Sequence, residues 1–135
     1  DMAFHRLVRS LLLHEPFPLY GDGSQSRNFT YVTDIVRANL AALFTGLDGD
    51  PPRFLGQPIN VGGGVRTTLS EVISVAEELT GERARLRRAG AQKGDVDRTE
   101  ADLTRARQWL GYEPRTALPV GLRAEVEWMR QLVQV

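Results

Sequence analysis

The 135-residue chain contains no cysteine. A disulfide framework and thiol chemistry are therefore excluded, and the composition fits a reducing compartment, which we expect to be the cytoplasm. No apolar run approaches the ~20 residues that a membrane-spanning helix needs, so we expect no membrane partner. The chain opens on Asp1, without a starting Met or a secretion signal, which suggests a truncated or excised segment.

An excess of charge of one sign is also lacking, because 17 Lys plus Arg balance 17 Asp plus Glu. The chain is therefore not expected to bind nucleic acid. His5 and His14 are the only histidines, and their spacing is not that of metal ligands. No serine lies in a nucleophile elbow, and no G-x-G-x-x-G motif occurs. We interpret Gly62-Gly63-Gly64 as a turn that follows a strand.

Apolar residues at steps of three and four predict amphipathic helices along most of the chain. Thr68-Leu69-Ser70-Glu71 is a capping box and Gly81 a left-handed C-cap, so the third helix has defined ends. Other caps remain open between neighbouring residues, Thr33 or Asp34 and Asp102 or Thr104. The predicted helices run from residue 2 to about 14, from Thr33 or Asp34 to about 47, from 69 to 80, from Asp102 or Thr104 to Gly111, and from 118 to 133. The predicted strands cover 29–32, 58–61 and 83–88.

Three short strands are too few to form a large sheet by themselves. We therefore expect a small mixed α/β fold that packs against a further domain. The helix faces lead us to expect four largely buried side chains, those of Phe4, Leu40, Leu43 and Trp128.

One polar stretch, Tyr20 to Val32, combines a Gly-rich turn with Arg27 at the start of the predicted strand. A guanidinium has a fixed fork of donors that matches phosphate oxygens, so this stretch is a candidate phosphate grip. The alternative is a solvated arginine beside a surface turn, and composition and spacing alone favour it.

Two further stretches are weaker candidates. In Ala91 to Asp95, the carboxylate of Asp95 is suited to ribose hydroxyls, and Gln92 or Lys93 to phosphate, although the stretch also fits a plain turn. In Val65 to Thr68, Arg66 and free N–H groups at a helix start would attract an anion, although a plain helix cap explains the same residues better.

Taken together, these stretches resemble the C-terminal half of the extended short-chain dehydrogenase/reductase family, the NAD-dependent epimerases and dehydratases of nucleotide sugars. The resemblance covers Asp1 to about Arg130 and rests on the order and spacing of several short motifs. These are Asp1-Met2-Ala3-Phe4, Tyr20-Gly21-Asp22-Gly23-Ser24-Gln25, Arg27 with Phe29-Thr30-Tyr31-Val32, Asn60-Val61-Gly62-Gly63-Gly64, Gly94-Asp95, Ala101-Asp102, Leu110-Gly111-Tyr112-Glu113-Pro114 and Gly121-Leu122.

The resemblance implies that residues 1–135 are the small mixed α/β substrate-binding portion of such an enzyme, without its Rossmann domain. The NAD fingerprint and the Tyr-x-x-x-Lys pair are absent, because no tyrosine here has lysine four residues later. We therefore expect no catalytic residue, no metal and no cofactor site in this chain, and no turnover by it alone. NAD and homodimerisation are expected of the full-length enzyme through the missing Rossmann domain.

The resemblance also implies roles for individual residues. Arg27 matches the arginine that holds the nucleotide diphosphate, Tyr20 the aromatic position beside the base, and Asp95 the carboxylate that takes the ribose hydroxyls. Phe4 lies in the segment that passes along the nucleotide. Gln92 stands where many relatives carry a second phosphate-binding arginine, which favours the branch that acts on UDP-glucuronate.

Two departures qualify these roles. Lys93 or Arg66 would have to supply the charge that Gln92 lacks. Asn28 stands where aspartate is frequent, and we assign it no function.

The expected function is thus UDP-sugar binding within a sugar epimerase or dehydratase that oxidises the sugar at C4 with NAD. Two other readings remain open: a non-catalytic UDP-sugar-binding module and an inert truncated fragment. The sequence argues weakly against the module, because the apolar faces of a half-domain would be left uncovered. The inert fragment would bind nothing because its site is incomplete.

Overall fold

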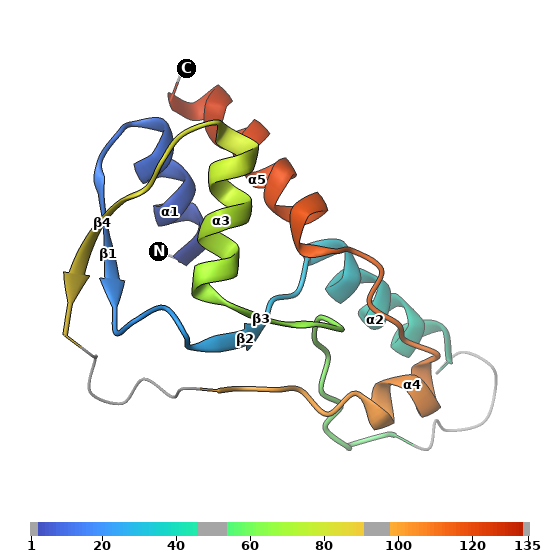
Figure 1. Ribbon diagram of the computed structural model, residues 1–135. Helices are drawn as coiled ribbons and strands as arrows, with labels where there is room; N and C mark the ends of the chain where they lie inside the picture. The colour runs from blue at the N-terminus through green and yellow to red at the C-terminus, as the bar shows by residue number, and fades with distance from the viewer. Residues whose placement is uncertain (1–2, 46–53, 91–97, 134–135) are drawn as a thin grey trace. The chain divides into compact units, whose positions relative to one another are not determined.

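A computed structural model describes residues 3–45, 54–90 and 98–133 of the chain (Figure 1). The chain divides into two compact units. The first unit comprises Asp1–Arg27, Thr67–Arg98 and Ala117–Val135, and the second comprises Asn28–Arg66 and Thr99–Thr116.

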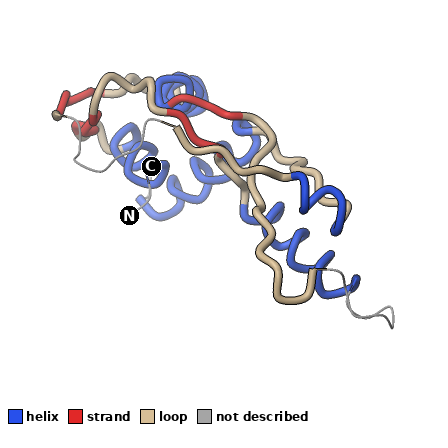
Figure 2. Tube along the Cα trace, turned by 90° about the horizontal axis from the view of Figure 1, so that it is seen from below, coloured by secondary structure: helices blue, strands red, loops and turns tan. Residues whose placement is uncertain are grey.

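The described elements are five helices and four short strands. The helices are α1 (Ala3–Leu12), α2 (Val32–Thr45), α3 (Leu69–Thr80), α4 (Thr104–Leu110) and α5 (Leu118–Val133). The strands are β1 (Pro16–Tyr20), β2 (Ser26–Asn28), β3 (Arg66–Thr68) and β4 (Arg85–Ala89). Most of the remaining described backbone is loop (Figure 2).

Three helices, α1, α3 and α5, pack side by side to form the core of the first unit (Figure 1). Their facing apolar stripes bury Leu11, Val72, Leu122 and Met129 almost completely. Beside them β1 and β4 pair in parallel, from Pro16 opposite Arg85 to Tyr20 opposite Ala89. The predicted helices at both ends of the chain are confirmed, and the predicted edge strand is confirmed as β4.

The predicted ends of α3 are also confirmed. Thr68 Oγ1 accepts from the backbone N–H of Glu71, and the Glu71 carboxylate accepts from the backbone N–H of Thr68. These hydrogen bonds, first the one from the Thr68 backbone, lower the pKa of Glu71. Gly81 ends the helix at φ 79°, a left-handed conformation that glycine adopts without strain.

The second unit has a much smaller core. Ala38 of α2 packs with Leu103, Ala106 and Tyr112 from the α4 region. Ile59 and Val61 lie against this cluster and are partly buried. Few large side chains are buried here, so the second unit has little apolar burial of its own to stabilise it.

The predicted strand over residues 29–32 is wrong, because β2 ends at Asn28 and α2 begins at Val32. The Tyr31 carbonyl accepts from the backbone N–H groups of Asp34 and Ile35, so the aromatic and β-branched stretch leads into a helix. The strand that does form, β2, pairs with β3.

The predicted strand over residues 58–61 is not part of any sheet within the described residues. Its apolar side chains face the small core, but no described segment offers its backbone a partner strand. A strand needs a neighbouring edge to form its ladder, and apolar composition does not supply one.

The predicted burial is wrong for three of the four side chains. Leu40, Leu43 and Trp128 are 45%, 57% and 47% exposed, whereas Phe4 is partly buried and does not belong to the exposed group. Periodicity identified apolar faces on α2 and α5 correctly, but burial also requires something that covers the face. In its described part the chain contains no helix long and apolar enough to cross a membrane.

Leu122 and Leu132 on α5 give a matched test of this core. Leu122 is 1% exposed and Leu132 is 56% exposed. We predict that Leu122→Ala lowers the free energy of unfolding by about 2–5 kcal/mol, while Leu132→Ala changes it by less than ~0.5 kcal/mol. Urea titration followed by circular dichroism measures both, and equal losses would contradict the helix packing.

Candidate functional site

The Gly-rich stretch predicted as a phosphate grip forms a tight, internally bonded turn after β1. Gly21 adopts φ 69°, and the Gln25 side-chain amide donates to the Tyr20 carbonyl at 2.9 Å. The backbone N–H of Ser24 donates to Asp22 Oδ1 at 2.9 Å. Hydrogen bonds from Ser24, the side-chain one first, lower the pKa of Asp22. The turn therefore has a defined shape rather than being a loose surface loop.

This turn is attached to the first turn of α3. The backbone N–H of Leu69 donates to the Gln25 carbonyl at 3.1 Å, and that of Ser70 donates to the Gly23 carbonyl at 3.0 Å. The Ser70 hydroxyl donates to the same Gly23 carbonyl at 3.1 Å. At Gly23, where φ is 87°, a Cβ would lie 2.5 Å from Ser70 Oγ. The close approach and the positive φ both require glycine at this position.

Because of this attachment, the backbone N–H groups at the start of α3 are already hydrogen-bonded. Leu69, Ser70 and Glu71 donate their N–H groups to Gln25, Gly23 and Thr68, so these donors are not free to bind an anion. The proposal of free N–H groups at this helix start is therefore wrong, and the cap is structural. Arg66 itself is exposed as the first residue of β3.

The described candidate residues of the first unit are Phe4, Tyr20 and Arg27. Phe4 lies in the first turn of α1, and Tyr20 ends β1 directly before the Gly-rich turn. Arg27 lies in β2 directly after the turn, and one of its guanidinium nitrogens donates to the Ser26 carbonyl at 2.9 Å. All three are partly buried. The anchored turn therefore links Tyr20 and Arg27 through a fixed stretch of backbone.

The other candidates are distributed differently. Arg66 belongs to the second unit. Gln92, Lys93 and Asp95 lie outside the described residues, so their predicted roles stay predictions. Within the described residues, no group of three or more His, Cys, Asp or Glu side chains has the arrangement of a metal site.

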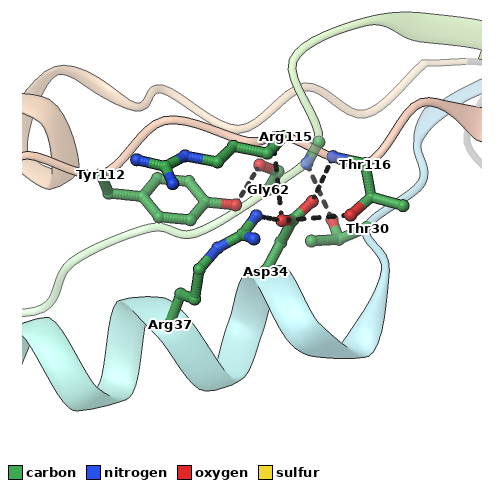
Figure 3. Close-up of polar contacts among 8 residues, drawn as sticks. Thr30, Asp34, Arg37, Gly62, Tyr112, Arg115 and Thr116 are labelled. Carbon is green, nitrogen blue, oxygen red and sulfur yellow. Dashed lines mark hydrogen bonds and ion pairs between the residues drawn. The ribbon is translucent and has the colours of Figure 1, made fainter.

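The second unit contains a polar centre around the buried carboxylate of Asp34. Asp34 is 1% exposed and lies in the first turn of α2, where it was expected to be a possible cap. Its carboxylate accepts from the backbone N–H groups of Arg115 at 3.3 Å and Thr116 at 3.1 Å, and from the Thr116 hydroxyl (Figure 3). Arg37 forms an ion pair with it from the next turn. Asp34 therefore fixes the segment after α4 to the start of α2.

Beside this centre, Tyr112 holds the glycine loop of residues 62–64. Its hydroxyl donates to the Gly62 carbonyl at 2.9 Å, and the ring is 4% exposed (Figure 3). Burial is the main cause that raises the pKa of Tyr112 above its ordinary value. The pairing joins residues fifty positions apart, which no local sequence signal indicates.

The raised pKa of Tyr112 gives a prediction with a definite sign. The neutral phenol is favoured in the folded state, so its contribution is complete below the ordinary tyrosine pKa of about 10 and is lost as pH rises through the higher folded-state pKa. We predict that Tyr112→Phe lowers the free energy of unfolding by ~1–2 kcal/mol at neutral pH and removes part of the alkaline loss.

Urea titrations from neutral pH to above pH 10 measure this effect. Tyr31→Phe is the control, because no hydrogen bond from the Tyr31 hydroxyl occurs in the described part of the chain. An alkaline profile that is unchanged in Tyr112→Phe would contradict the assignment.

Known proteins with a similar sequence and a similar fold exist. An uncharacterised UDP-glucose epimerase of Bacillus subtilis is 37% identical over 134 residues, which are 99% of this chain and 40% of that protein. A UDP-glucuronate 4-epimerase of Thermodesulfobacterium geofontis is 31% identical and is also covered to 40%. A crystal structure of UDP-glucuronic acid 4-epimerase from Bacillus cereus, in complex with UDP-glucuronic acid and NAD, matches 98% of this chain and 40% of its own at 36% identity and a TM-score of 0.89.

The chain thus spans about 40% of the length of these relatives. Its small mixed α/β fold is that of the C-terminal part of extended short-chain dehydrogenase/reductase epimerases. The family model described as GDP-mannose 4,6 dehydratase matches residues 4–124, nearly the whole chain. The chain belongs to this family of nucleotide-sugar epimerases and dehydratases and corresponds to the C-terminal portion of its members.

Proposed function

We propose that this chain is the UDP-sugar-binding part of an NAD-dependent sugar epimerase or dehydratase. The observation that carries the proposal is the anchored turn between Tyr20 and Arg27, which belongs to a fold shared with an epimerase crystallised with UDP-glucuronic acid. A guanidinium held in place before the ligand arrives binds more tightly, because a preordered group loses less entropy on binding.

In this proposal Arg27 binds the diphosphate and Tyr20 lies beside the base. A guanidinium presents parallel donors to phosphate oxygens, and an aromatic ring offers a flat apolar surface to a base. Asp95 accepts from the two ribose hydroxyls, and Phe4 lies along the nucleotide. The anchored turn supports the first two roles, since it links Tyr20 to Arg27 by bonded backbone.

The sugar we propose is glucuronate. Gln92 supplies an amide where a second arginine is frequent, which leaves phosphate binding to Arg27 with Arg66 or Lys93. Two of the similar proteins are named for UDP-glucuronate or UDP-glucuronic acid 4-epimerisation, which supports this choice.

The chemistry belongs to the portion of the protein that lies outside this chain. NAD would supply hydride transfer at the sugar, and the chain contains neither a G-x-G-x-x-G loop nor a Tyr-x-x-x-Lys pair to bind it and move the proton. What this chain's residues contribute is binding energy at the remote nucleotide, which holds the sugar in position for the reaction.

Exposed apolar side chains in the second unit indicate that another part of the protein packs against it. Leu40, Leu43 and Phe44 on α2 are about half exposed, and the extended residues 58–61 have no sheet partner within the described part of the chain. Exposed apolar faces of this kind occur at interfaces. We propose that the N-terminal Rossmann portion of the full-length enzyme covers α2.

We also propose, from the family resemblance and the absence of cysteine, that the full-length enzyme is a cytoplasmic homodimer.

The Arg27 role predicts a specific kinetic change. In the full-length enzyme, Arg27→Ala should cost about 2–4 kcal/mol of binding, a rise of ~30-fold or more in KM for the UDP-sugar, and should leave NAD affinity nearly intact. Arg123→Ala, at an exposed position on α5, is the control. An unchanged KM in Arg27→Ala would exclude the phosphate role.

If α2 packs against the Rossmann portion, substitutions on its exposed face should affect stability differently in the 135-residue chain and in the full-length enzyme. Leu40→Gln with Leu43→Gln should change the stability of the 135-residue chain by less than ~1 kcal/mol, because both side chains are already exposed. In the full-length enzyme the same pair should lower the melting temperature by several degrees or more, since polar groups would then be buried. Leu132→Gln is the control. Equal effects in both proteins would contradict the interface.

Two rival functions lead to other results. A stand-alone UDP-sugar-binding module would bind UDP-sugars in the same way, but joining it to a Rossmann portion would not give turnover. An inert fragment would bind none.

A further inference from the structure

Backbone segments 28–30 and 62–64 make an unusually close contact in the second unit. A Cβ at Gly63 would lie 2.0 Å from the Phe29 carbonyl oxygen, which no side chain tolerates. On either side, a Cβ at Gly62 would lie 2.9 Å from Ala101, and one at Gly64 would lie 2.9 Å from Pro114. The three glycines are therefore required by space, and the loop is more than the plain turn that its sequence suggests.

Two side chains fasten this contact. The Asn28 amide donates to the Gly63 carbonyl at 3.1 Å, and Thr30 Oγ1 accepts from the Gly63 N–H at 2.8 Å. The Thr30 hydroxyl also donates a hydrogen bond to the Asn28 carbonyl at 3.4 Å. The backbone N–H and C=O of Gly63 are thus both bound by side chains from the end of β2 and the segment that follows it. We call this arrangement, Asn28 and Thr30 around Gly63, the glycine clamp.

The clamp begins one residue after Arg27. Arg27 and Asn28 are neighbours in β2, which pairs with β3 and ends at Asn28. The Arg27 backbone sets which positions its guanidinium can reach. A shift of this strand end would therefore change the side-chain conformation needed to bind a phosphate at a fixed position. Misplacement by about 1 Å is enough to weaken an oriented contact severely.

We infer that the glycine clamp is a positioning device for Arg27, and that Asn28 and Thr30 are positioning residues for nucleotide-sugar binding although neither is assigned a ligand contact. This inference rests on the proposed diphosphate role of Arg27. It gives a function to Asn28, whose amide supplies the donor that an ionised aspartate lacks.

Thr30 is the better residue to test. Gly63→Ala is expected to prevent folding, because the clash is with backbone. Asn28 has a second effect, since its Oδ1 is buried without a partner among the described residues beside a hollow of about 310 Å³. Thr30→Val removes only the hydroxyl at nearly constant volume, and Thr30→Ser restores it.

The experiment is a double-mutant cycle on UDP affinity in the full-length enzyme, measured by calorimetry. Thr30→Val should weaken UDP binding by about tenfold, and Thr30→Ser should stay within ~3-fold of the native protein. In the Arg27→Ala background, Thr30→Val should have no further effect, because the positioned group is gone. Tyr112→Phe is the matched control, since it releases the same glycine loop from its other side and should change UDP affinity by less than ~2-fold.

Three results would overturn the inference. One is unchanged UDP affinity in folded Thr30→Val, and another is an equal loss with and without Arg27. The third is an equal loss in Tyr112→Phe, which would indicate general destabilisation. If Arg27→Ala itself leaves UDP affinity unchanged, the proposed function fails and the positioning role fails with it. Amide hydrogen exchange at residues 27–30 then tests the clamp alone, since Thr30→Val must accelerate it if the clamp holds this backbone.

Discussion

The first unit depends on how the backbone donors at the start of α3 are satisfied. A helix leaves its first four N–H groups without helical acceptors, and here Thr68, Leu69, Ser70 and Glu71 donate to four acceptors, two from the capping box and two from the Gly21–Gln25 turn. The helix therefore fixes the turn as much as the turn caps the helix. Because α3 packs against α1 and α5, the candidate nucleotide site is supported by the core of its unit.

The two units are stabilised by different means. The first has a continuous apolar core between three helices, whereas the second relies on polar anchors around a small core. Asp34 holds residues 115 and 116, Tyr112 holds Gly62, and Asn28 with Thr30 holds Gly63. A buried carboxylate requires all of its partners, so such a centre specifies one geometry without adding much net stability. The exposed apolar faces of this unit support its proposed packing against the Rossmann portion.

Sequence reasoning succeeded where the signals are local. The capping box and Gly81 gave both ends of α3, Gly111 gave the end of α4, and short motifs in order gave the family. It failed where the outcome depends on distant segments. The stretch 29–32 has the composition of a strand but provides the carbonyl that starts α2, and residues 58–61 have no strand beside them in the described part of the chain. The burial of Leu40 and Leu43 depended in the same way on a cover that periodicity does not reveal.

Within the candidate site, the residue types indicated the chemistry. The structure shows which contacts hold the Gly-rich turn in place. Arg27 was identified from the Gly-rich turn before it, and Tyr20 from the family resemblance. The attachment of Gly23 to Ser70, however, joins positions forty-seven residues apart. No pattern along the chain records such a pair. The glycine clamp was missed for the same reason, since Gly62–Gly64 looks like any turn until the Phe29 carbonyl is seen against it.

The central claim is that the chain carries a preformed grip for the nucleotide of a UDP-sugar, separate from the NAD site. Calorimetric titration of the 135-residue chain with UDP, UDP-glucuronate and NAD tests it most directly. We predict heats of binding for both UDP compounds and none for NAD. Absence of binding by either UDP compound would contradict a preformed grip and would mean that the site forms only when the rest of the enzyme is present.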